Sequence, residues 1–121
     1  MSHFKIKSFY ENWLQKQATR LSKQKVIYYC KIIGLDHTGV KIRIKFQRNR
    51  VGSLGRNLVL NFNKNLLHLP MKIIDYVVVH ELCHVHIPDH SSKYWQLVGS
   101  VISDYKRRKE WLEINKQEII S

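Results

Sequence analysis

Two histidines in the second half of the chain are spaced to hold a metal ion, and a glutamate beside them could act on a metal-bound water. They are His80, Glu81 and His84, in the order His-Glu-Leu-Cys-His. Successive residues of a helix are about 100° apart, so the two imidazoles lie about 40° apart on one face. Both can reach one ion, and Glu81 lies beside that face, where a carboxylate can take a proton from a water molecule activated by the metal. The pattern indicates metal-assisted hydrolysis.

A third protein ligand is needed, because a catalytic zinc usually takes three and leaves its fourth position to water. We predict that this ligand is His90. Pro88 ends the helix, and Pro88 and Asp89 together favour a turn that folds the chain back toward the ion. The sequence therefore predicts one Zn²⁺ per chain, with Glu81 as the general base. The predicted ligands are His80, His84 and His90.

Two other interpretations of the motif remain open. One is an exposed polar helix face that binds no metal. The other is a closed structural zinc site with Cys83 or His86 as fourth ligand, because structural zinc normally has four protein donors. A free cysteine is more often a small buried hydrophobe, which favours a packing role for Cys83.

The composition is typical of one folded domain covering residues 1–121. Of the 121 residues, 44% are hydrophobic and 25% are charged, as in ordinary globular proteins of this size. No apolar run approaches the roughly 18 residues that span a bilayer, so we expect no membrane partner. The first residues lack the apolar core of a secretory signal, and two cysteines make no disulfide framework. We therefore expect a cytoplasmic protein with free thiols.

The charge is strongly positive, with 21 Lys and Arg against 9 Asp and Glu and a formal net charge of +12. Such a potential favours anionic partners, including nucleic acids and nucleotides. The basic run at 106–109 could contact phosphates, although such runs are more often a solvated helix face. The charge indicates a class of partner and identifies none.

The residues around the motif predict the elements that position it. Apolar residues at helical spacing predict a helix over 8–24, and alternating residues predict a strand over 40–46. Residues 57–63 predict a second strand, joined to the first as a hairpin through the glycines of 51–55. Residues 26–33 are a further candidate strand.

Two helices are predicted in the second half of the chain. Pro70 suits the first turn of a helix that carries the motif to about residue 86. Ser91 or Ser92 can cap a final helix, whose apolar face includes Tyr94 and continues to residue 105. Helices and strands together predict an α+β fold.

Short motifs on both sides of the histidines resemble those of a known family. They are Tyr-Val-Val-Val-His-Glu-Leu-Cys-His at 76–84, Asp-His-Ser at 89–91, Tyr-Trp at 94–95, Asp-Tyr at 104–105 and Trp-Leu at 111–112, preceded by Arg50, Gly-Ser at 52–53, Leu-Asn at 60–61 and Leu-Pro at 69–70. Over residues 40–112 the chain resembles the YgjP-like metallopeptidase domain, which is related to the SprT-type zincins.

The resemblance implies a minimal zincin fold with an N-terminal helix, a small mostly antiparallel sheet, the HExxH helix and a C-terminal helix. It also implies zinc at the three histidines, a base at Glu81 and a peptide or protein substrate. One segment departs from the family pattern: Arg-Trp-Gly-Ser-Cys is replaced by Arg-Val-Gly-Ser-Leu at 50–54. Candidate contacts to the substrate or transition state are Arg50, Asn61, His86 and Tyr94.

Three functions are compatible with these observations. The first is a zinc-dependent hydrolase, foremost a metallopeptidase, in which the strand 58–62 aligns an extended peptide by edge pairing. The second is a metal-dependent hydrolase of a non-peptide bond such as a nucleotide phosphoanhydride, with Arg50 suited to phosphate. The third is a non-enzymatic basic module that binds nucleic acid and contains a structural zinc.

Overall fold

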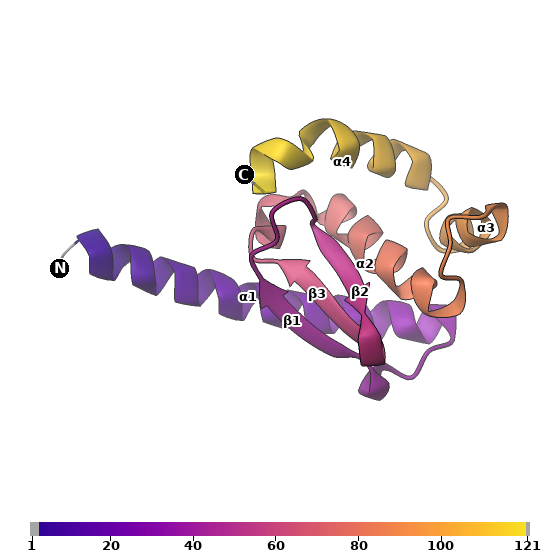
Figure 1. Cartoon of the computed structure of the whole chain (residues 1–121), viewed down its shortest axis with the longest axis horizontal. Helices are drawn as coiled ribbons and strands as arrows, with labels where there is room; N and C mark the ends of the chain where they lie inside the picture. Colours follow the sequence, from indigo (N-terminus) through magenta and orange to yellow (C-terminus); the bar gives the residue numbers. More distant parts are fainter. Residues whose placement is uncertain (1–2, 121) are drawn as a thin grey trace.

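The computed structural model describes residues 3–120 (Figure 1). Within them the chain forms four helices and three strands joined by short turns. In chain order these are α1 (His3–Ile33), β1 (Lys41–Lys45), β2 (Gly52–Gly55), β3 (Val59–Asn63), α2 (Met71–His86), α3 (Ser92–Val101) and α4 (Tyr105–Ile120). The arrangement confirms the predicted α+β class.

The strands form one mixed sheet in the order β1-β3-β2. β1 pairs with β3 in parallel, and β2 pairs with β3 antiparallel. The predicted hairpin is therefore wrong, since residues 52–55 form β2 rather than a turn, and the sheet is mixed rather than mostly antiparallel. Alternation reveals a strand in the sequence but carries no information on the direction of its neighbour.

The central strand begins later than predicted. Asn57 and Leu58 have φ angles of 59° and 56°, in the left-handed region that interrupts an extended strand. β3 consequently starts at Val59, and both of its edges are paired, one with β1 and one with β2. The segment 58–62 is thus unable to pair with a peptide, and β2 is the edge strand on its side of the sheet.

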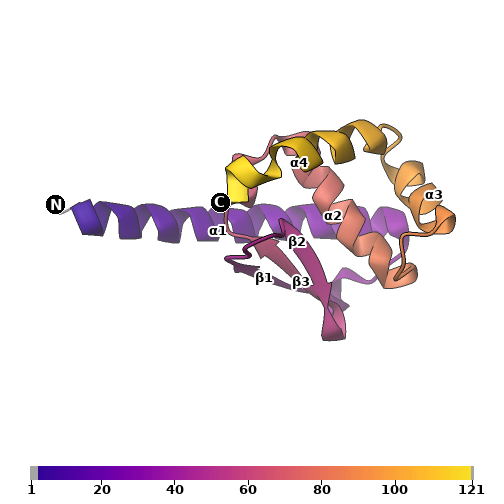
Figure 2. The same cartoon turned by 45° about the horizontal axis from the view of Figure 1, so that its top comes forward.

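Helix α1 continues through residues 26–33, so the candidate strand there is wrong. Val26 and Cys30 are buried, whereas Ile27, Tyr28 and Ile32 are exposed, and burial at a spacing of four residues is the helical pattern. The second half of α1 packs against α2 and β1, and its first half extends beyond the rest of the fold (Figures 1 and 2). No helix within residues 3–120 has the length and apolarity needed to cross a membrane.

Helix α2 lies in the middle of the molecule, between α1 and α4 and against β2 (Figure 2). Its buried side chains, including Val78 and Leu82, join Leu60 and Phe62 of β3 in one core. A Cβ at Gly52 would lie 3.2 Å from both Phe62 and Val77, so glycine lets β2 approach the helix closely. This packing places the edge strand beside the helix that carries the histidines.

The C-terminal segment that was predicted to be one helix forms two, α3 and α4. Ser91 caps α3, as predicted, with its Oγ accepting from the Tyr94 N–H at 3.4 Å. Ile102 then adopts extended angles and ends α3. α4 begins at Tyr105 and returns over α2 (Figure 1), which places Lys109 of the basic run around the same hollow as His80 and His90.

Both cysteines are free and fully buried, as the sequence predicted for a thiol in the core. Burial raises the pKa of Cys30 and raises the pKa of Cys83 to about 12, so the reactive thiolate is scarce. We expect an aromatic disulfide reagent to modify neither thiol in the native protein and both in guanidinium chloride, as followed by absorbance. Fast modification of one thiol under native conditions would contradict this packing.

Candidate metal centre

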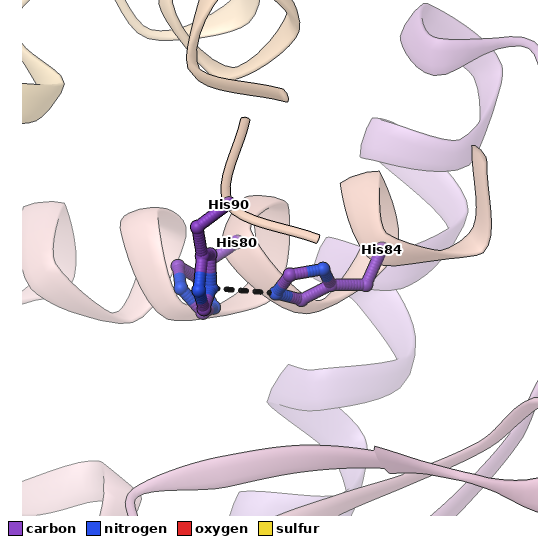
Figure 3. Close-up of side chains that lie close together, drawn as sticks. All are labelled: His80, His84 and His90. Carbon is purple, nitrogen blue, oxygen red and sulfur yellow. Dashed lines mark hydrogen bonds between the residues drawn. The ribbon is translucent and has the colours of Figure 1, made fainter. Parts of the chain in front are cut away.

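The three predicted ligands lie together at one end of α2. His80 and His84 project from α2, and His90 comes from the segment between α2 and α3 (Figure 3). One ring nitrogen from each lies within 4.8 Å of the other two, and Nε2 of His84 is 3.0 Å from Nε2 of His90. Three converging imidazoles are a donor set typical of catalytic zinc, so these residues fit the predicted ion.

His84 is oriented by the break that ends α2. Its Nδ1 lies 3.1 Å from the carbonyl oxygen of Ile87, so the neutral ring donates there and leaves Nε2 as a ligand. Ile87 has extended angles, which the following Pro88 favours. One local feature of the sequence therefore turns the chain toward His90 and orients His84.

His90 is held in a short turn. The Asp89 carboxylate accepts from the Ser91 N–H at 3.1 Å, and hydrogen bonding with the Ser91 side chain, together with this backbone bond, lowers the pKa of Asp89. Burial, together with His84 and His80, lowers the pKa of His90. A lowered pKa favours the neutral ring, which is the form that binds a metal.

Glu81 is a mostly buried carboxylate beside the ligands. Its side chain is 10% exposed, and Oε2 lies 3.1 Å from Nδ1 of His80. A neutral His80 that donates from Nδ1 keeps its other nitrogen for a metal. Glu81 also lines the hollows around the metal centre, so the carboxylate both supports a ligand and faces the space where a substrate would bind.

Tyr94 packs beneath the ligands. It is fully buried, its ring is stacked on that of His84 with centroids 4.4 Å apart, and its hydroxyl donates to the His80 carbonyl at 2.8 Å. Tyr94, a candidate for transition-state contact, thus contacts two of the three histidines, and its hydroxyl is directed at the backbone of α2.

The variant Tyr94→Phe is expected to lose about 1 kcal/mol of unfolding free energy, because one intramolecular hydrogen bond is removed while the stacked ring remains. Zinc content should stay unchanged. Urea unfolding and metal analysis check both values. A large loss of catalytic rate with normal stability and zinc content would instead mean that the hydroxyl contacts the reacting atoms.

The other candidate residues are separated by the fold. Arg50 lines the hollows around the metal centre, whereas Asn61 belongs to the central strand and lines neither of them. His86 points toward α1, where its Nε2 lies 3.2 Å from the Ile33 carbonyl. Cys83 is buried in the core. Among residues 3–120, neither Cys83 nor His86 joins the three-histidine group.

Two adjoining hollows flank the histidines, with volumes of about 520 and 420 Å³. Both are lined by Gly52 at the sheet edge and by Glu81. The larger one extends to Lys109, Glu113 and Lys116 of α4. The smaller one follows β2. Together they make a cleft that runs past the metal centre along the edge of the sheet.

A stack of rings connects the third ligand to α4. Trp95 lies 5.7 Å from His90 and 5.4 Å from Tyr105, between centroids, at interplanar angles of 20° and 12°. Lys109 Nζ lies 5.2 Å from the centroid of Trp95. A Cβ at Gly99 would come within 3.1 Å of Tyr105, so glycine permits this approach.

Sequence reasoning missed that α4 forms a wall of the cleft. The basic run 106–109, which includes Lys109, was expected only to contact phosphates or to form a solvated helix face. The pairing of Trp95 with Tyr94 and the basic run were visible, but the path of α4 depends on contacts with α2, which no local pattern encodes.

Comparisons with known proteins agree with the fold and identify the family. The crystal structure of the metallopeptidase zymogen of Pyrococcus abyssi abylysin has a TM-score of 0.71 and 21% identity, covering 79% of this chain and 95% of that chain. The zymogen of Methanocaldococcus jannaschii jannalysin has a TM-score of 0.67 and 20% identity, covering 81% and 97%. No curated protein matches. The model of the YgjP-like metallopeptidase domain matches residues 2–115, and the chain therefore belongs to this family.

Proposed function

We propose that the protein is a zinc-dependent peptidase in which Glu81 activates water for attack on a peptide bond. One observation carries the proposal: three histidine nitrogens converge beside a mostly buried carboxylate, in a cleft that borders the edge strand β2. Membership of a metallopeptidase family and the likeness to two metallopeptidase zymogens support the same reaction.

The residues divide the chemistry between them. A zinc ion held by the three histidines supplies a Lewis acid that makes water acidic and polarises a carbonyl group. The Glu81 carboxylate accepts a proton from the attacking water at one oxygen and delivers it to the leaving nitrogen as the C–N bond breaks. The His80 Nδ1–H keeps that carboxylate at the floor of the cleft.

The edge strand β2 is the element suited to align a peptide. Gly52, Ser53 and Leu54 line the cleft, and within residues 3–120 no other strand lies beyond β2 at this edge of the sheet. Backbone pairing with an exposed sheet edge binds an extended peptide without demanding a particular sequence. This role replaces the one that the sequence suggested for residues 58–62.

Cleavage of a diverse peptide library by the zinc-loaded protein, followed by mass spectrometry, tests the proposal. We expect cleavage that stops on chelation of the metal and returns when zinc is added back. The intact, chelated protein should keep its helical circular dichroism, because its core is built from apolar side chains. Unfolding on chelation would indicate a structural zinc instead.

The same preparation separates the remaining alternatives. Hydrolysis of a nucleoside triphosphate without cleavage of any peptide would favour a phosphoanhydride substrate. Steeply salt-dependent binding of nucleic acid without any turnover would favour a non-enzymatic module. We also propose the cytoplasm as the compartment, which two buried free thiols support.

A further inference from the structure

The hollow on the α4 side of the metal centre is rich in cations. Arg50, Lys109 and Lys116 line it, and apart from Glu81 at the metal centre its one acidic residue is Glu113. The smaller hollow contains Arg50 but no lysine, and its far end is lined by Leu54 and Pro88. Positive charge is therefore concentrated on one side of the position where a peptide bond would be cleaved.

Lys109 is held in place from two directions. Its ammonium lies 5.2 Å from the centroid of the Trp95 ring and 3.4 Å from Oε1 of Glu113. Trp95 is itself stacked on His90, so the ammonium is positioned close to the third ligand. The lysine side chain remains 42% exposed and Glu113 is 62% exposed. An incoming anion can therefore replace Glu113 as the partner of Lys109.

We propose that this hollow is a subsite for a carboxylate of the substrate, bound by Lys109 and Lys116. The inference rests on the proposed peptidase function and names the class of peptide that it would prefer. Two lysines in a concave wall raise the local positive potential, which a single exposed ion pair does not achieve. The volume of about 520 Å³ is within the range of pockets that bind small ligands.

The sheet edge assigns this carboxylate to one side of the scissile bond. The first residue of β2, Gly52, borders both hollows, whereas Leu54 borders only the one without lysines. An antiparallel ladder is slightly more stable than a parallel one. A peptide paired antiparallel to β2 runs from Leu54 toward Gly52, so the residues after the scissile bond enter the hollow with the lysines. The carboxylate then belongs to an acidic side chain there or to the chain terminus.

Matched peptides test the subsite. Two pairs of peptides are made from a sequence that is cleaved in the library. In one pair, Glu or Gln follows the scissile bond; in the other, Glu or Gln precedes it. We expect kcat/KM to be about fivefold higher for Glu than for Gln after the bond at low salt, and equal for the exchange before it. The preference should decline as salt screens the charges.

Each peptide is also made with a free and an amidated C-terminus. A preference for Glu that persists in the amidated peptides supports an acidic side chain as the ligand. A preference that depends on the free terminus supports the terminal carboxylate. Equal kcat/KM for all of these peptides would overturn the subsite while leaving the peptidase function intact.

Variants on α4 connect the preference to the lysines. The double variant Lys109→Gln with Lys116→Gln should remove the preference, so that this variant cleaves the Glu and Gln peptides with equal kcat/KM. Lys109→Arg keeps the charge and should keep the preference, and Glu113→Gln should increase it by freeing Lys109. Lys106→Gln is the control, because Lys106 is exposed on the same helix and does not line the hollow.

Binding tests the subsite independently of turnover. The Glu81→Gln protein, mixed with pairs of library peptides that differ only in Glu or Gln, whether or not the wild type cleaves them, and followed by tryptophan fluorescence, should bind the Glu peptide about fivefold more tightly. Equal affinities would overturn the subsite, even if no peptide is cleaved by the wild-type protein. A preference that survives in the double lysine variant would overturn it as well. Failure of the peptidase function therefore remains distinguishable from failure of the subsite.

Discussion

Glu81→Gln is expected to lower kcat/KM for a cleaved peptide by about 10² to 10⁴-fold, the usual contribution of a general acid–base group. Glutamine has the same shape, and its carbonyl oxygen can still accept from Nδ1 of His80, 3.1 Å away in the native protein. The variant loses only the capacity to take up and return a proton. Zinc content, measured by elemental analysis, should therefore stay at about one ion per chain, as the three-histidine ligand set requires.

The neighbouring carboxylate of Glu113 provides the control. It lines the same cleft but is exposed and lies on α4, so Glu113→Gln should change cleavage of a neutral peptide less than about twofold, as surface ion pairs contribute little. Retention of more than a tenth of the wild-type rate in Glu81→Gln would show that another group acts as the base.

His84→Ala is expected to abolish high-affinity zinc binding and, with it, peptide cleavage. Loss of a residue that only supports a metal ligand usually costs about 10 to 100-fold in affinity, so loss of a ligand should weaken binding by more than about 100-fold. The effect is local, because His84 packs on Tyr94 at the surface of a core made by other residues. Competition with a chromophoric chelator measures the affinity.

His86→Ala is the matched control for this experiment. His86 lies on the same helix, two residues further on, and its Nε2 approaches the carbonyl of Ile33 rather than the metal centre. We expect this variant to bind zinc as the wild type does. Equal loss of zinc in both variants would indicate a closed site with four protein ligands, and unfolding of the metal-free protein would agree with that outcome.

Local features of the sequence were sufficient to predict that His80, His84 and His90 lie together. The spacing of His80 and His84 places both rings on one face of any helix, whatever surrounds it. Pro88 ends that helix through its own backbone geometry, and the turn that follows presents His90. These relations involve neighbours within about ten residues, so they can be derived before the fold is known.

Features that depend on distant parts of the chain could not be derived in this way. Residues 26–33 are apolar enough for a strand. They form a helix because the helical repeat places Val26 and Cys30, four residues apart, on the same side, where both are buried against the core. The direction of β1 and the position of β2 follow from pairing with β3, which sequence alternation does not specify.

The walls of the cleft were decided by tertiary structure alone. Asn61 and His86 have suitable side chains, but the sheet and the phase of α2 direct them away from the metal. Lys109, some twenty residues beyond the last ligand, is brought to the cleft by the return of α4 over α2. Local geometry sets the ligands because helix periodicity acts within a few residues, whereas the substrate-facing surface depends on packing between elements that are far apart in the chain.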